Sequence, residues 1–228
     1  MVVGSVFVAA CGQGPATPSH STSAGTPTAH AAAAVGRRTI LIEGTSLTAG
    51  LGLDPDEAWP AILQQRIDSE GLPFQVVNAG LSGETSAGAL RRVDWLLRGP
   101  VDVFVLETGA NDGLRGLDPD SLRGNLEAIL GKVKAARPAA VLCVVQMEAP
   151  PNMGAAYAKR FHAAYGEAAR AVGARLLPFL LAGVAGKPAL NQADGIHPTA
   201  VGARMVAATE WEALAPVLRS IDGARKSM

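Results

Sequence analysis

Four short stretches of the chain contain residue types that suit acyl-transfer chemistry. A serine hydroxyl is a weak nucleophile until a base takes its proton, and a histidine oriented by a carboxylate can be that base near neutral pH. Backbone N–H groups or a side-chain amide can then stabilise the oxyanion that forms. The stretches are G-T-S-L with Ser46, N-A-G with Gly80, G-A-N-D with Asn111, and D-G-I-H-P with Asp194 and His197.

Each of these residues also has a purely structural interpretation when it is taken alone. Ser46 can cap a short helix, and Gly80 can supply a positive φ. The sequence Asn-Asp-Gly at Asn111 is typical of a turn, and the Asp-x-x-His pair can cap the last helix. The catalytic interpretation therefore depends on whether the elements around these residues bring them to one place.

Apolar strands and amphipathic helices alternate along the chain from residue 37. Strands with a continuously apolar sequence, separated by helices, indicate a five-stranded parallel sheet that is covered on both faces. The expected strands are 38–43, 75–78, 101–106, 139–146 and 175–177, and the expected helices are 57–69, 86–97, 119–137, 155–172 and 198–218, the last with Pro198 in its first turn.

In parallel sheets of this kind, ligands bind beyond the carboxyl ends of the strands. Ser46, Gly80 and Asn111 follow the first three expected strands, and the Asp-x-x-His pair precedes the last helix. We therefore expect one site, with Ser46 as nucleophile, His197 as base and Asp194 orienting the imidazole. The N–H groups of Ser46 and Gly80 and the amide of Asn111 are the expected oxyanion donors.

These motifs resemble the blocks of the SGNH (GDSL) hydrolase family, over about residues 38–218. The stretches S-L-T-A-G-L-G-L, N-D-G-L-R-G and M-E-A-P-P-N-M-G-A-A-Y are similar to its acyl-CoA thioesterase I, arylesterase and lysophospholipase L1 group. The resemblance implies a three-layer α/β/α sandwich of flavodoxin-like type, the catalytic roles given above, and no metal or organic cofactor. Gly44-x-Ser46 lacks the second glycine of G-x-S-x-G, so the nucleophile elbow of α/β-hydrolases is not matched.

One residue departs from the pattern of the family. Thr45 stands before the serine, where the family usually has aspartate. That aspartate is not a triad member, so we expect activity to be retained. A threonine keeps an oxygen that can hydrogen-bond but removes a charge beside the nucleophile, which can alter the pH optimum or the substrate range.

The expected substrate is a small acyl ester. Leu114 and Leu117 can line an acyl groove, with Pro151 and Met153 on its other wall. The expected activity is that of an arylesterase or short-to-medium acyl esterase, with thioesterase or lysophospholipase activity included. The alternatives are a polysaccharide or xylan acetyl esterase and a non-catalytic lipid-binding lipoprotein. A carboxylate pair of Glu43 and Glu107, as in glycosidases, is a weaker alternative.

The composition argues against several other classes of function. The 20 basic and 20 acidic residues give a formal net charge of zero, and aromatic residues make up only 4%. A nucleic-acid-binding protein would normally show a basic stripe or a stacking platform, and a polybasic membrane patch is equally missing. Cys143 lies in the apolar stretch A-V-L-C-V-V, so we expect a buried thiol and no disulfide with Cys11.

The N-terminal segment predicts export. Residues 1–11 are apolar and end in V-A-A-C, which resembles the lipobox of bacterial lipoproteins, with Cys11 as the lipidated residue that tethers the protein to a membrane. Residues 12–36 are rich in Pro, Ser, Thr, Ala and Gly and read as a disordered linker, and the hydrolase domain is expected over 37–228. A periplasmic or cell-surface protein is expected, for which cytosolic acyl-CoA would not be the natural substrate; without a signal the protein would be cytoplasmic.

Overall fold

The fold is built on one parallel sheet. The computed structural model describes Met1 and residues 36–226, and the described residues from Gly36 onward belong to one compact unit. The five strands are all parallel, in the order β2-β1-β3-β4-β5. They are β1 (Arg38–Gly44), β2 (Phe74–Gly80), β3 (Val103–Leu106), β4 (Val141–Gln146) and β5 (Arg175–Phe179).

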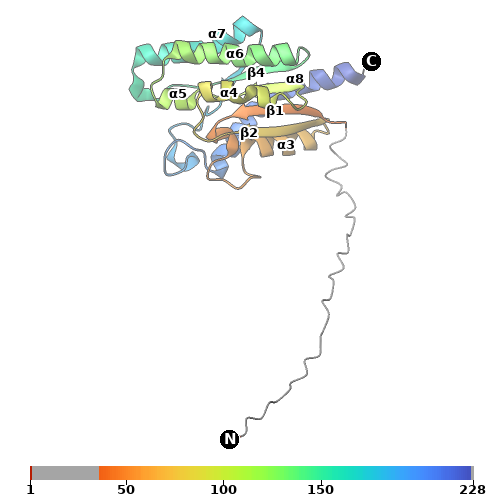
Figure 1. The fold of residues 1–228 in the computed structure, drawn as a ribbon, viewed down its shortest axis with the longest axis horizontal. Helices are drawn as coiled ribbons and strands as arrows, with labels where there is room; N and C mark the ends of the chain where they lie inside the picture. The colour runs from red at the N-terminus through yellow and green to blue at the C-terminus, as the bar shows by residue number, and fades with distance from the viewer. Residues whose placement is uncertain (2–35, 227–228) are drawn as a thin grey trace. The chain divides into compact units, whose positions relative to one another are not determined.

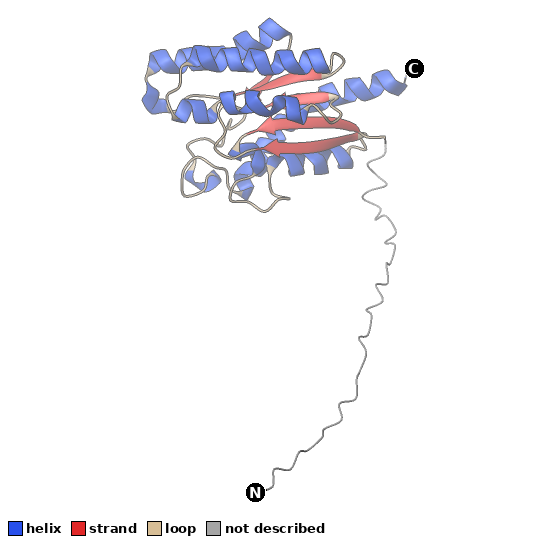
Figure 2. Cartoon of the chain, in the orientation of Figure 1, coloured by secondary structure: helices blue, strands red, loops and turns tan. Residues whose placement is uncertain are grey.

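Helices cover both faces of the sheet, as Figures 1 and 2 show. Helices α4, α6 and α7 pack on one face, and α3 and α8 pack on the other. Between these layers β3 is buried throughout and β4 is buried after its first residue, because the side chains of these strands are almost all apolar. The helices are α2 (Ser46–Ala49), α3 (Trp59–Ser69), α4 (Ser86–Leu96), α5 (Ala110–Leu114), α6 (Pro119–Ala136), α7 (Ala155–Val172) and α8 (Ala200–Lys226), with short 3-10 turns η1 (Pro151–Met153) and η2 (Pro188–Leu190).

The predicted three-layer α/β/α architecture is confirmed, and most boundaries agree to within two or three residues. The prediction for the last helix is wrong at both ends. Pro198 forms an antiparallel bridge with Asn191, and its carbonyl accepts a hydrogen bond from Gln192, so the chain is extended there. The helix begins after Thr199, whose hydroxyl accepts from the N–H of Gly202, and it continues through Pro216 to Lys226.

The stretch at Asn111 is also not the simple turn that Asn-Asp-Gly alone suggests. It forms the short helix α5, which begins after Gly109 at φ 102°. The carboxylate of Asp112 accepts hydrogen bonds from the backbone N–H and the hydroxyl of Ser86 at 2.8 and 2.5 Å. This contact fixes α5 against the first residue of α4, so the two elements share one position at the edge of the sheet.

The expectation of a buried Cys143 is confirmed. Cys143 is a buried free thiol in β4, and burial raises its pKa to about 12. Phe161 and Tyr165 on α7 are fully buried, whereas His162 beside them is exposed. Among the residues that the structure describes, no helix has both the length and the hydrophobicity needed to cross a membrane. The predicted signal segment, Cys11 and the linker lie outside the described residues, apart from Met1 and Gly36.

Candidate active site

Ser46, His197 and Asp194 form a hydrogen-bonded chain at the carboxyl edge of the sheet. Ser46 is the first residue of α2, directly after β1 and Thr45. Its Oγ lies 2.8 Å from Nε2 of His197, and Nδ1 of the same ring lies 2.6 Å from Oδ2 of Asp194. This is the order of contacts in which a histidine takes a proton from a serine while a carboxylate fixes its tautomer.

The loop around Asp194 holds the histidine from two sides. Oδ1 of Asp194 accepts the backbone N–H groups of Ile196 and His197 at 2.9 and 3.0 Å, while Oδ2 takes the imidazole. The hydrogen bond to the His197 side chain, followed by these two backbone bonds, lowers the pKa of Asp194 to about 2. The carboxylate is therefore ionised at any pH at which the enzyme would work, although its side chain is 45% exposed.

A buried carboxyl holds the chain just before and after the serine. Glu107 follows β3 and is fully buried. Its Oε2 accepts from the backbone N–H of Thr45 and the hydroxyl of Thr48, each at 2.8 Å, and the hydroxyl of Thr45 donates to the same group. Burial raises the pKa of Glu107, and these hydrogen bonds oppose the rise. Thr45 therefore keeps a hydrogen-bonding role in the place where the family has aspartate.

The three expected oxyanion donors lie at the same edge but differ in their present partners. The N–H of Gly80 donates to Oδ1 of Asn78 at 2.9 Å, so a substrate oxygen would have to share or replace that bond. One N–H of the Asn111 amide donates to the carbonyl of Glu84 at 2.9 Å, which leaves the second for a substrate. Ser46 stands in the first turn of α2, where backbone N–H groups lack partners within a helix.

Gly80 is required by close packing and not by its backbone angle. Gly80 is not among the glycines with positive φ, so the interpretation that it only supplies a positive φ is wrong. A Cβ on Gly80 would lie 2.2 Å from the backbone nitrogen of Ala49 and 2.7 Å from its Cα. Such distances are too short for any Cβ, so only glycine lets α2, with Ser46, lie directly against the end of β2.

Glu43 and Glu107 do not form the acid–base pair of a glycosidase. Both side chains are fully buried, so neither reaches a substrate. Glu43 is 3.6 Å from Arg92, and burial raises its pKa to about 8. Within the described part of the chain, no three His, Cys, Asp or Glu side chains are grouped so that they could hold a metal ion.

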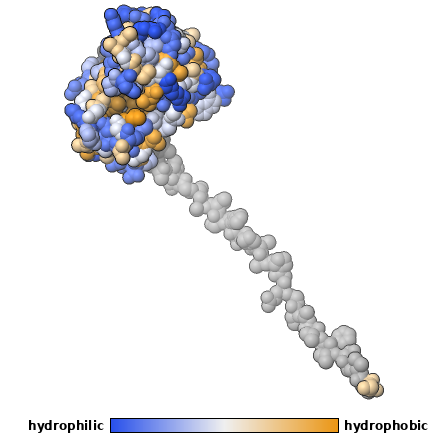
Figure 3. Space-filling model, turned by 90° about the vertical axis from the view of Figure 1, so that its left-hand side faces the viewer, coloured by the Kyte–Doolittle hydropathy of each residue, from blue (hydrophilic) through white to orange (hydrophobic). Residues whose placement is uncertain are grey.

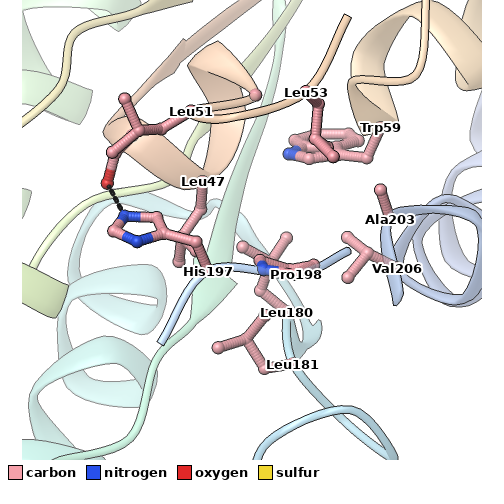
Figure 4. Close-up of a pocket in the computed structure, with 12 residues that line it drawn as sticks. Leu47, Leu51, Leu53, Trp59, Leu180, Leu181, His197, Pro198, Ala203 and Val206 are labelled. Atoms are coloured by element: carbon pink, nitrogen blue, oxygen red, sulfur yellow. Dashed lines mark hydrogen bonds between the residues drawn. The ribbon is translucent and has the colours of Figure 1, made fainter. Parts of the chain in front are cut away.

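A small apolar cavity adjoins Ser46 and His197. Figure 4 shows His197 on one side and Trp59 and Val206 on the other, with Pro198 between His197 and Val206 and with Leu180 and Leu181 below Pro198. Ser46 and Leu51 also line it. Its volume is about 10 Å³, which is room for about one water molecule, so an acyl chain does not fit inside it in this conformation.

The predicted acyl-groove residues lie on the surface near Asn111. Leu114 and Leu117 are 49% and 40% exposed, and Met153 lies close enough for its Cε to be 3.0 Å from a Cβ placed on Gly116. Pro151 is exposed in η1 beside Met153. Figure 3 looks onto this end of the molecule and shows apolar side chains gathered among hydrophilic ones.

Sequence reasoning missed other residues around the site. Leu51, Leu81 and Ile196 are exposed apolar side chains next to or near the catalytic candidates along the chain. Arg92 stands outside every motif described above, and the sequence suggests Glu107 only as one half of a glycosidase-like carboxylate pair. For Glu107 the available signal was a charged side chain directly after the fully apolar strand 101–106.

Comparisons with known proteins agree with this geometry. Residues 44–205 match the model of the "GDSL-like Lipase/Acylhydrolase family". The chain is 41% identical to the esterase TesA of Pseudomonas aeruginosa over 79% of this chain and 90% of the relative. It is 42% identical to the thioesterase 1/protease 1/lysophospholipase L1 of Escherichia coli K12, over 70% of this chain and 75% of the relative.

A solved structure shows the same fold. The psychrotrophic esterase EstA from Pseudoalteromonas sp., determined in a form inhibited by monoethylphosphonate, superimposes with a TM-score of 0.75 at 36% identity. The match covers 80% of this chain and 99% of the esterase. The range matched by the family model, residues 44–205, contains Ser46, β2 to β5 and the Asp-x-x-His loop, and with the identity to TesA this shows that the chain belongs to the GDSL-like lipase/acylhydrolase (SGNH hydrolase) family.

Proposed function

We propose that the protein is a carboxylic ester hydrolase that acts through an acyl-enzyme on Ser46. The observation that carries this proposal is the continuous chain of hydrogen bonds from Ser46 through His197 to Asp194. The similarity to named esterases and to a thioesterase/lysophospholipase supports the same reaction class.

In the first half-reaction, Oγ of Ser46 attacks the ester carbonyl carbon while Nε2 of His197 takes the hydroxyl proton. The tetrahedral intermediate collapses when the bond to the leaving oxygen or sulfur breaks, and the imidazolium gives its proton to that atom. In the second half-reaction, His197 takes a proton from water, and the hydroxide formed attacks the acyl-enzyme. The acid leaves as Ser46 regains the proton. Asp194 stays ionised throughout and stabilises the imidazolium.

The oxyanion would be held by the N–H groups of Ser46 and Gly80 and by the free amide hydrogen of Asn111. One such donor is typically worth about 10²–10³-fold in kcat. The bond between the Gly80 N–H and Asn78 exists before substrate binds, so this donor is already oriented but must exchange partners. We expect it to contribute less than Asn111.

We propose short-to-medium acyl esters and aryl esters as substrates. The cavity beside Ser46 is too small for a chain, so the acyl group would lie on the open surface lined by Leu114, Leu117, Pro151 and Met153. A shallow apolar surface discriminates weakly between chain lengths, since each added methylene is worth only about 0.8 kcal/mol when it is fully buried. Broad chain-length tolerance, with some thioester and lysophospholipid hydrolysis, is therefore expected.

The test is hydrolysis of p-nitrophenyl esters from C2 to C14 by the parent and by Ser46→Ala. The proposal predicts turnover by the parent and a loss of about 10³-fold or more in the variant. Leu114→Ala and Leu117→Ala should raise KM for the longer chains and leave the C2 ester unchanged. Activity confined to C2 and to acetylated xylan would instead favour the polysaccharide acetyl esterase. No turnover of any ester or thioester would favour a lipid-binding lipoprotein.

We further propose that the protein is exported and tethered through a lipidated Cys11. The proposal rests on the V-A-A-C sequence after an apolar run and on the uncharged linker that follows. Expression of the full chain with a radiolabelled fatty acid should label the parent and leave Cys11→Ser unlabelled. Equal labelling of both would contradict lipidation at this residue.

A further inference from the structure

We propose that Arg92 is a positioning residue that orients the oxyanion donors of this site, an inference that rests on the function proposed above. Arg92 lies on α4, outside every catalytic motif, and its side chain is only 20% exposed. Its guanidinium contacts the ends of two strands and the loop that leads to α4. Each of these contacts leads to a different one of the three proposed donors.

The first contact fixes the peptide that carries the Gly80 N–H. Nη2 of Arg92 donates to the carbonyl of Ala79 at 2.8 Å. The peptide bond is planar and trans, so its C=O and N–H point in opposite directions. An arginine that holds the Ala79 carbonyl therefore also sets the direction of the Gly80 N–H.

The second contact fixes the chain that leads to Ser46. The same Nη2 lies 3.2 Å from the carbonyl of Gly44, which also accepts from the N–H of Leu81 at 2.8 Å. On the other side of this peptide, the N–H of Thr45 donates to the buried Glu107. The Gly44–Thr45 peptide, which precedes the peptide that carries the Ser46 N–H, is thus held at both ends, by Arg92 and by Glu107.

The third contact reaches Asn111 through Glu84. Nε of Arg92 lies 2.9 and 2.7 Å from the two carboxylate oxygens of Glu84, and Nη2 lies 2.7 Å from Oε2. The backbone carbonyl of Glu84 accepts one amide hydrogen of Asn111. Since the amide group is planar, that bond sets the direction of the second hydrogen, which is the one free for a substrate oxygen.

The surroundings make Arg92 suited to this role. The N-terminus of α4 is anchored by Ser86, which bonds to Asp112 in α5 and to Asn125 in α6. The fully buried carboxyl of Glu43 lies 3.6 Å from Nε of Arg92, so the guanidinium has a second acidic side chain beside it. A planar guanidinium can bind two carbonyls and a carboxylate together in fixed directions, whereas a lysine ammonium binds as a point charge.

The experiment compares Arg92→Ala and Arg92→Lys with the parent, using p-nitrophenyl butyrate. Misaligned donors stabilise the transition state less but leave substrate binding unchanged. The kcat should therefore fall about 10–100-fold in either variant, with KM within about twofold of the parent. Arg91→Ala is the matched control, because Arg91 is the exposed neighbour on the same helix. Its kcat should equal that of the parent.

A pair of ketone inhibitors separates orientation of the donors from general loosening. An alkyl trifluoromethyl ketone adds to Ser46 and forms an oxyanion, whereas the matching methyl ketone binds without forming one. The variants should lose affinity for the trifluoromethyl ketone by about the factor lost in kcat and keep their affinity for the methyl ketone. Arg92→Lys keeps the charge and the aliphatic stem, so it carries the test if Arg92→Ala fails to fold.

The outcomes distinguish this inference from the function on which it rests. If the parent hydrolyses no ester, the proposed function is wrong whatever Arg92 does. If the parent is active and Arg92→Lys keeps kcat within twofold, the role of Arg92 is overturned while the function stands. Equal loss of affinity for both ketones would also overturn it, because that result indicates a disordered site and not misdirected donors.

Discussion

The hydroxyl of Thr45 donates to the buried carboxyl of Glu107, at 3.0 Å from Oε1 and 3.1 Å from Oε2. The contact joins the residue before the nucleophile to the end of the neighbouring strand β3. An aspartate carboxylate at position 45 has no hydrogen to donate, so the threonine supplies a hydrogen bond to Glu107 that an ionised aspartate would not. The departure from the usual family sequence thus has a local structural consequence.

Replacing Thr45 by valine tests this contact. The shape is kept, but a donor to a buried carboxyl is lost, so the free energy of unfolding should fall by about 1–3 kcal/mol. Urea unfolding followed by circular dichroism measures the change. Thr45→Ser keeps the donor and should stay within about 1 kcal/mol of the parent. An unchanged stability in Thr45→Val would show that Thr48 and the backbone N–H satisfy Glu107 without it.

A methyl group on Gly80 should displace α2. The added Cβ would lie 2.2 Å from the nitrogen of Ala49, and backbone cannot move aside as a flexible side chain can. Gly80→Ala should therefore lower the melting temperature by several degrees and reduce kcat by at least about tenfold. Gly124→Ala is the control, because nothing lies within 4 Å of a Cβ there and alanine favours the helix. A fully active Gly80→Ala protein would contradict the close packing of α2 on β2.

Asp194→Asn should inactivate the enzyme without unfolding it. The amide oxygen can still accept the backbone N–H groups of Ile196 and His197, but its NH₂ group would face Nδ1 of His197. That arrangement favours the imidazole tautomer with the proton on Nε2, which cannot take the proton of Ser46. We expect kcat to fall by about 10³–10⁴-fold.

The structure offers a matched control for Asp194. His162 and Glu148 form a similar pair, with Nδ1 and Oε1 2.7 Å apart, and none of the serines that the structure describes is hydrogen-bonded to that histidine. Glu148→Gln should leave kcat unchanged. Steady-state kinetics with p-nitrophenyl butyrate measures both variants, and comparable losses in the two would show that a general effect of charge is responsible.

Buried carboxyls should make stability depend on pH. Burial raises the pKa of Glu43 and that of Glu210 to about 8, from 4.5 for an unperturbed group. Between pH 4.5 and 8 the unfolded chain ionises at these residues and the folded chain does not. Each group should therefore lower the free energy of unfolding by up to about 1.4 kcal/mol per pH unit in this window, with no further loss above it.

Glu210→Gln removes one of these ionisations, so it should reduce the slope and raise the free energy of unfolding most at pH 8. Both oxygens of Glu210 lack hydrogen-bond partners, so the substitution breaks no hydrogen bond of that carboxyl. Glu212→Gln, two residues along the same helix but exposed, should leave the slope unchanged. Chemical unfolding at pH 5, 6, 7 and 8 provides the measurement. Parallel profiles for the parent and Glu210→Gln would contradict the raised pKa.

Local sequence patterns were sufficient to predict the layers and the triad. The apolar strands, the amphipathic helices and the position of Ser46 after β1 can all be read within short windows. The Asp-x-x-His spacing likewise places Asp194 and His197 in contact within one loop, as the structure has them. The rule that sites lie beyond the carboxyl ends of parallel strands then brings the motifs together.

The supporting contacts could not be predicted, because they join residues far apart in the chain. Arg92 reaches Gly44, 48 residues away, and Glu107 reaches Thr45, 62 residues away. Neither contact leaves a periodic signal in the sequence. The start of α8 was misjudged for a related reason: Pro198 suits a helix start by its φ, but its bridge to Asn191 holds it in an extended segment.

Covalent labelling is the most direct test of Ser46 as the nucleophile. The protein would be incubated with a p-nitrophenyl alkylphosphonate, and intact mass and peptide mapping would locate the adduct. We expect one phosphonyl group per chain, on Ser46, with release of one equivalent of p-nitrophenol and none in Ser46→Ala. Stoichiometric labelling at another residue, or ester turnover that persists in Ser46→Ala, would contradict it.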